Sequence, residues 1–258
     1  MVAIGFVSAK GSPGCTTATL ALSHAWLDLP GQRRVLIAEC DPAGGDIARG
    51  YLRGSLDTDR GIVALAVRRT PDGVAALWEQ LLALDSDGRQ LLLPGINDPS
   101  QGASLEAACA ILRTAIPELA EQEPPLDVLV DLGRLHAQHD PRQLWGALDW
   151  LILVTRSSLA AVAAAEPAAR ELRSEVVGPQ LSCVVVGEGQ PYTAKEIATA
   201  LALPLLGKFP DDPAGAAVFS GASPAGWRTS RSPLLRSARL LAERLVADVP
   251  LAGELADV

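Results

Sequence analysis

The chain has 258 residues, of which 48% are hydrophobic and 20% charged, and its formal net charge is −8 at pH 7. This length is sufficient for one large α/β domain with a substantial core, and we expect a single domain over residues 1–258. The negative charge and the short apolar runs exclude a membrane-spanning protein, and they argue against strong binding to DNA or to anionic membranes.

The N-terminal segment predicts a strand, a glycine loop and the start of a helix. Residues 2–7 form an apolar run without the basic region or cleavage site of a signal peptide, so we expect a core strand and a cytoplasmic protein. Residues 9–17 read Ala-Lys-Gly-Ser-Pro-Gly-Cys-Thr-Thr, and a helical pattern covers residues 16–27. Glycines allow successive N–H groups to point inward, and the positive end of a helix strengthens the field. The segment therefore predicts a phosphate-binding loop in which Thr16 contacts Mg²⁺.

One position of this loop departs from the usual pattern. The ordinary motif has lysine directly after the last glycine, where it reaches the β- and γ-phosphates, but here that residue is Cys15. Lys10 is the only cation of the loop. The loop resembles the deviant P-loop of the ParA/MinD family, whose early signature lysine is matched by Lys10, although Ser12 replaces the second glycine.

The resemblance implies ATP and Mg²⁺ as ligands and a homodimer in which Lys10 reaches the partner's site as a catalytic residue. The nucleotide-binding residues that it implies are Lys10, Gly11, Ser12, Pro13, Gly14, Cys15, Thr16 and Thr17.

A second predicted strand, at residues 35–38, ends in acidic residues. Glu39, Asp41 and Asp46 follow it with two glycines between, at a carboxyl end where doubly wound sheets bind ligands. The family has two acidic residues that flank one position here, and Glu39 and Asp41 match them. The resemblance implies that Asp41 is catalytic and orients the attacking water or the metal. The alternative is an acidic turn in which Asp46 caps a helix.

Residues 126–131 form an apolar strand that ends in a carboxylate, as a Walker B segment does. Asp131 would then hold Mg²⁺ through its water shell, together with Thr16 and Asp41. Gly133 and Arg134 follow where the family usually has a small-residue loop. Either Arg134 or Lys10 could replace the charge that is missing at Cys15.

Strand and helix patterns alternate along the whole chain. This alternation predicts an α/β fold with a doubly wound, mostly parallel β-sheet flanked by helices on both faces. The order of elements resembles ParA/MinD throughout, including residues 203–212, which implies a P-loop NTPase of the SIMIBI type. Beyond the elements above, we expect helices at residues 61–69, 74–84, 104–116 (ending before Pro117), 159–172 and 194–201, and strands at residues 90–95, 150–155, 181–186 and 205–208.

Two groups of residues that could suggest a metal site are interpreted otherwise. Cys15, Cys40, Cys109 and Cys183 have no metal-ligand spacing, and we expect reduced thiols, three of them packed in the core. Residues 136–140 contain two histidines and an aspartate, for which an exposed loop is favoured over a ligand set.

The C-terminal region predicts a helix from Ser232 with an apolar face and a basic patch, Arg228 to Arg244. ParA proteins bind DNA through such patches, but a solvated helix face is the favoured interpretation. The tail at residues 250–258 is short and acidic, unlike the basic membrane-binding helix at the end of MinD.

Residues 44–48 and the degenerate P-loop most resemble the CpaE/TadZ branch, which positions pilus and secretion machinery. Our first hypothesis is a nucleotide switch that dimerises and positions a partner assembly of this kind or partitioning machinery, with weak or absent ATP hydrolysis. The alternative is a pseudo-ATPase scaffold that no longer binds or turns over nucleotide. A metabolic ligase is less supported because no substrate motif is present. The family often places an adenine-reading asparagine where this chain has residues 187–189, so the sequence does not predict the base.

Overall fold

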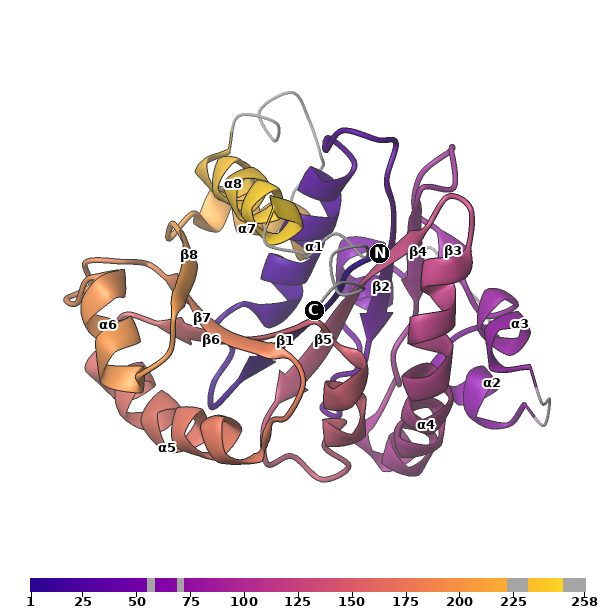
Figure 1. Ribbon diagram of the computed structural model, residues 1–258, viewed down its shortest axis with the longest axis horizontal. Helices are drawn as coiled ribbons and strands as arrows, with labels where there is room; N and C mark the ends of the chain where they lie inside the picture. Colours follow the sequence, from indigo (N-terminus) through magenta and orange to yellow (C-terminus); the bar gives the residue numbers. More distant parts are fainter. Residues whose placement is uncertain (55–58, 69–71, 222–231, 248–258) are drawn as a thin grey trace, which may run out of the picture.

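A mostly parallel sheet of eight strands organises the chain (Figure 1). The structure is a computed structural model that describes residues 1–54, 59–68, 72–221 and 232–247. The strand order is β3-β4-β2-β5-β1-β6-β7-β8, and all neighbours are parallel except β3 and β4. The predicted α/β architecture is therefore confirmed. The strands are β1 (Ala3–Ser8), β2 (Arg34–Glu39), β3 (Leu82–Ala83), β4 (Gln90–Leu93), β5 (Leu126–Arg134), β6 (Trp150–Arg156), β7 (Gln180–Val186) and β8 (Leu205–Phe209).

Helices cover both faces of the sheet because alternate strand residues point to opposite sides. In β1, Ile4 and Phe6 pack beneath α1, α7 and α8, whereas Ala3 and Val7 belong to the core on the opposite face. Figure 1 shows these two layers of helices above and below the sheet. The helices are α1 (Cys15–Trp26), α2 (Ile62–Ala66), α3 (Gly73–Trp78), α4 (Gly102–Glu118), α5 (Leu159–Glu175), α6 (Ala194–Leu201), α7 (Pro213–Phe219) and α8 (Pro233–Ala247), with short turns at Ile47–Tyr51, Pro99–Gln101, Leu119–Glu121 and Arg142–Ala147.

The helix predicted at residues 74–84 is wrong in its second half. The helix α3 ends at Trp78, and Leu82 and Ala83 instead pair antiparallel with β4 as the edge strand β3. A short apolar run fits either a helix or a strand, and the free edge of β4 decides between them here. The helix predicted at residues 61–69 is also shorter, since α2 ends at Ala66.

Two other predicted boundaries differ from those in the structure. The helix α4 passes through Pro117 to Glu118, although we expected it to end before this proline. Ile116 and Leu119 are both buried, and their packing stabilises the last turn despite the missing N–H. The strand β5 continues past Asp131 to Arg134, where we expected a loop.

The C-terminal helix α8 has the predicted apolar face, with Leu234, Ala238, Leu241 and Leu245 buried. Part of the predicted basic patch, namely Arg228 and Arg231, lies outside the described residues, as do Arg69 and the tail at residues 250–258. Within the described part of the chain, no helix is both long and apolar enough to cross a bilayer.

Candidate phosphate-binding site

The loop between β1 and α1 presents backbone donors to solvent. Gly14 precedes the first residue of α1 with φ 107°, a left-handed conformation that favours glycine, and no side chain caps the helix. In the described part of the chain, the N–H groups of Gly11, Ser12 and Gly14 have no hydrogen-bond partner. The first turn of α1 contains no acidic residue. These donors and the helix start therefore form a site that suits an anion.

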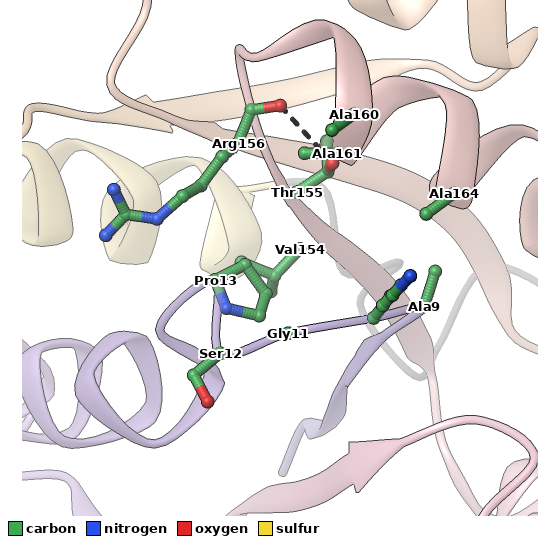
Figure 2. Close-up of a pocket in the computed structure, with 11 residues that line it drawn as sticks. Ala9, Gly11, Ser12, Pro13, Val154, Thr155, Arg156, Ala160, Ala161 and Ala164 are labelled. Atoms are coloured by element: carbon green, nitrogen blue, oxygen red, sulfur yellow. Dashed lines mark hydrogen bonds between the residues drawn. The ribbon is translucent and has the colours of Figure 1, made fainter.

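A cavity of about 350 Å³ opens over this loop. It is lined by residues 11–17 and, from the neighbouring strand ends, by Asp41, Asp46, Arg134 and Arg156. The exposed Lys10 does not line this cavity. It lines an adjoining cavity of about 330 Å³ between the loop, β6 and α5 (Figure 2). The structure thus brings most of the predicted residues together and places Lys10 on the other side of the loop.

Thr16 and Asp131 meet at the base of the cavity. The Thr16 hydroxyl donates to Oδ2 of Asp131 at 2.5 Å, and the N–H of Gly133 donates to Oδ1 at 3.1 Å. Asp131 is fully buried. Burial is the main cause that raises its pKa to about 7, and the charge of Asp41 acts in the same direction, whereas the hydrogen bond from Thr16 lowers the pKa. A hydroxyl beside a carboxylate is a donor set that suits Mg²⁺.

Asp41 lies close to Gly133, at the end of the neighbouring strand. A Cβ atom on Gly133 would lie 2.2 Å from Cγ of Asp41, so only glycine leaves room for this carboxylate. Oδ1 of Asp41 accepts from the N–H of Ala43 at 2.8 Å. Desolvation by partial burial is the main cause that raises its pKa, and the charge of Arg134 acts in the opposite direction. The arrangement holds a carboxylate at the wall of the cavity, near Thr16 and Asp131.

Glu39, which matches the first of the family's two acidic residues, does not line the cavity. Its side chain is 1% exposed and accepts from the N–H of Ile47 at 2.7 Å and of Gly95 at 3.0 Å. It therefore joins the loop after β2 to the end of β4. Asp46 occupies the N-cap position of Ile47–Tyr51, but its side chain makes no capping hydrogen bond there and lines the cavity.

Cys15 carries no charge toward the cavity. It is 7% exposed, and burial together with the charge of Asp131 raises the pKa of its thiol well above the ordinary value. The thiol therefore stays protonated near neutral pH, and the effect of the helix start does not produce a thiolate. All four cysteines are buried, one more than we expected.

Arg156 is a residue of the site that the sequence analysis missed. It ends β6, and Figure 2 shows its side chain extending over Pro13 at the opening of the loop. Its guanidinium lies 3.8 Å from Asp211. A cation directly after an apolar strand, at the carboxyl edge of a parallel sheet, is the signal that could have identified it.

A smaller cavity of about 150 Å³ continues from the loop toward the end of β8. Phe209, Pro210 and Asp211 line it together with Gly14 and Arg156. It is more apolar than the cavity over the loop, which suits a ring rather than a phosphate.

The two histidines of residues 136–140 each contact a carboxylate. His136 contacts Glu171 at 3.0 Å, and His139 contacts Glu106 at 3.2 Å. Across the described ranges, no group of three or more histidine, cysteine, aspartate and glutamate side chains has the arrangement of a metal site.

The fold is that of solved MinD and ParA-family structures. A chain of the MinC:MinD cell division protein complex from Aquifex aeolicus is 18% identical with a TM-score of 0.74, covering 97% of this chain and 98% of that one. MinD with Mg-ADP from Pyrococcus horikoshii is 20% identical with a TM-score of 0.73, covering 96% and 97%. A ParA-family ATPase from Chlorobium tepidum is 17% identical with a TM-score of 0.67, covering 94% and 98%. No family model and no curated protein matches the sequence.

The raised pKa of Asp131 predicts a pH-dependent stability in the absence of Mg²⁺. Its pKa is about 7 in the folded protein against an ordinary value of 3.8, so the folded state binds the proton more tightly. Its contribution to the free energy of unfolding therefore falls between pH 3.8 and about pH 7. Asp131→Asn should remove this loss, so the variant gains stability relative to wild type as pH rises. Urea denaturation in EDTA at pH 5 and pH 8 tests this, and an unchanged difference between the two proteins would contradict it.

Proposed function

We propose that this chain is a ParA/MinD-type nucleotide switch of one domain, residues 1–258, that dimerises in the cytoplasm and positions a partner assembly. The observation that carries the proposal is the contact between Thr16 and Asp131 at the base of the cavity over the glycine loop. This is the relation between a P-loop hydroxyl and a Walker B carboxylate that holds Mg²⁺ in P-loop proteins. The shared fold with MinD and a ParA-family ATPase supports it.

The residues present fit Mg·ATP. The N–H groups of residues 11, 12 and 14–17 would hold the phosphates, and the Thr16 hydroxyl with the carboxylates of Asp41 and Asp131 would hold the ion. The cavity beside Phe209 would take the base. When bound, the ion neutralises phosphate charge and polarises the terminal phosphate.

The same residues support slow hydrolysis. Asp41, at the cavity wall, would orient a water molecule, but the neutral Cys15 would give no charge to the phosphates. A phosphate transfer site without its lysine loses transition-state stabilisation. The missing charge at Cys15 also fits the alternative function, namely a pseudo-ATPase scaffold that no longer binds or turns over nucleotide.

Calorimetric titration with Mg·ATP separates the two functions. We expect the wild type to bind Mg·ATP and Thr16→Ala to bind it about tenfold more weakly, since a hydrogen-bonding metal ligand is lost. Thr114→Ala is the control, because Thr114 is an exposed residue of α4 whose hydroxyl bonds only the backbone of its own helix. Absence of heat with the wild type would favour the scaffold.

The partner is proposed to be a protein of pilus, secretion or partitioning machinery. The CpaE/TadZ-like sequence at residues 44–48 supports this class, and the solved MinC:MinD complex is an example of such pairing in this fold. The described arginines of α8 do not form a free basic surface, since Arg239 pairs with Glu243 and Arg244 donates to the carbonyl of Leu206. Strong binding to DNA or membranes is therefore not part of the proposal.

Dimerisation that depends on nucleotide should require Lys10. Its side chain lines the cavity toward α5 rather than the cavity of its own loop, as expected of a residue that serves a partner. Lys10→Ala would remove a charge-assisted contact that forms only in the dimer. Light scattering with Mg·ATP should then show a wild-type dimer and a monomeric variant. A nucleotide-dependent dimer in Lys10→Ala would show that this residue does not bridge the subunits.

A further inference from the structure

Arg156 lines all three cavities that surround the glycine loop. β6 lies beside β1 with Val154 opposite Ser8, so the residue that ends β6 lies above the loop that follows Ser8. Arg156 and Pro13 are the two residues shared by the cavity over the loop and by both adjoining cavities. Figure 2 shows the guanidinium directed away from α5 and over the loop. A charged group at this place can reach an anion in the central cavity.

The guanidinium is held only loosely. Among the described residues its one ion pair is with Asp211 at 3.8 Å, and the two side chains are 49% and 38% exposed. An exposed pair at this distance is weak, so a phosphate can displace the carboxylate at small cost. The planar guanidinium also matches phosphate oxygens with two parallel donors.

The other two cations near the loop are placed less well. Lys10 does not line the central cavity. Arg134 does, but its charge acts on Asp41, which it helps to keep ionised. Lys10 and Arg134 are the replacements for the missing lysine that the sequence predicts, whereas Arg156 is a third cation, which lines the cavity over the loop.

We infer that Arg156 supplies, from the same chain, the phosphate-binding charge that Cys15 lacks. This inference rests on the proposed function and names the residue that compensates for the altered loop. The charge reaches the phosphates from the end of β6 rather than from the start of α1. Arg156 is thus a binding residue whose charge acts on the polyphosphate part of the ligand, although it also borders the cavity proposed for the base.

Titrations with Mg·ATP, tripolyphosphate and adenosine test the inference. Arg156→Ala should weaken binding of Mg·ATP and tripolyphosphate about tenfold to a hundredfold, because a hydrogen-bonded charge is lost, and it should weaken adenosine much less. Arg156→Lys should recover part of the affinity. The matched control is Arg170→Ala, since Arg170 is an exposed arginine of α5 that pairs with Glu166.

A double-mutant cycle with Cys15→Lys gives the sharper result. If Arg156 replaces the missing lysine, Arg156→Ala should weaken Mg·ATP much less in the Cys15→Lys protein than in the wild type. Equal losses in both backgrounds would overturn the compensation, and unchanged Mg·ATP affinity in Arg156→Ala would overturn the contact itself.

The failures of the two proposals are distinguishable. Wild-type protein that binds neither Mg·ATP nor tripolyphosphate overturns both. If the wild type binds tripolyphosphate through Arg156 but binds Mg·ATP no more tightly than tripolyphosphate, the nucleotide switch is overturned. The contact between Arg156 and an anion is then supported.

Discussion

Cys15→Lys is expected to raise the rate of ATP hydrolysis about a hundredfold, the equivalent of about 2.7 kcal/mol of transition-state stabilisation. Phosphoryl transfer spreads negative charge over the terminal and bridging oxygens, and the P-loop lysine is one of the few groups placed to neutralise it. Cys15 lines the cavity over the loop, so a longer side chain can extend into it. Asp41, which lines this cavity, and the buried Asp131 both lie close enough to act on residue 15, and they would stabilise the new ammonium group.

Phosphate release at saturating Mg·ATP measures the effect. Cys15→Met is the control, since it lengthens the side chain without adding charge and should leave the rate low. An equal increase in Cys15→Met would show that shape rather than charge limits turnover. A folded Cys15→Lys protein that remains inactive would favour the scaffold, and a wild-type rate already equal to that of Cys15→Lys would show that another cation fills the vacancy.

Asp127→Ala is expected to lower the free energy of unfolding by about 3 to 5 kcal/mol, because it leaves several buried donors without an acceptor. Asp127 is 2% exposed at the start of β5. Its carboxylate accepts from the N–H of Val2 and from Nε1 of Trp26, both at 2.7 Å, and from Arg33 at 2.9 Å. It thereby joins β1, α1 and the approach to β2, the elements that position the loop.

Urea denaturation of Asp127→Ala measures this loss, with Asp87→Ala as the control at an exposed turn. Asp127→Asn keeps one oxygen acceptor and should lose less than Asp127→Ala, so it extends the test if the alanine variant does not fold. A loss below about 1 kcal/mol for Asp127→Ala would contradict the role of this carboxylate.

Much of the site could be predicted because its parts are local in sequence. A strand, a glycine loop and a helix start place residues 11–17, and the carboxylates of Asp41 and Asp131 follow two other strands directly. Parallel strands carry their carboxyl ends to one edge, so these segments meet there. Their assignment to nucleotide and Mg²⁺ stays a prediction.

The features of the fold and the site that could not be predicted depend on contacts between segments distant in sequence. Glu39 ends a strand beside Asp41, but its carboxylate is buried and accepts from the N–H groups of Ile47 and Gly95. These two donors are distant from one another in sequence. Arg156 belongs to the site because β6 pairs with β1, a neighbour relation that the sequence does not state. The end of α3 and the strand β3 depend likewise on the free edge of β4.

Hydrogen exchange of the wild-type protein with and without Mg·ATP tests the central proposal most directly. The N–H groups of Gly11, Ser12 and Gly14 have no partner in the described chain, so phosphates bound there should slow their exchange strongly. We expect protection at residues 11–17 and, more weakly, at residues 39–46, where Asp41 would engage the ion. Exchange at residues 11–17 that stays unchanged under saturating Mg·ATP, or protection confined to another part of the chain, would contradict nucleotide binding at this loop.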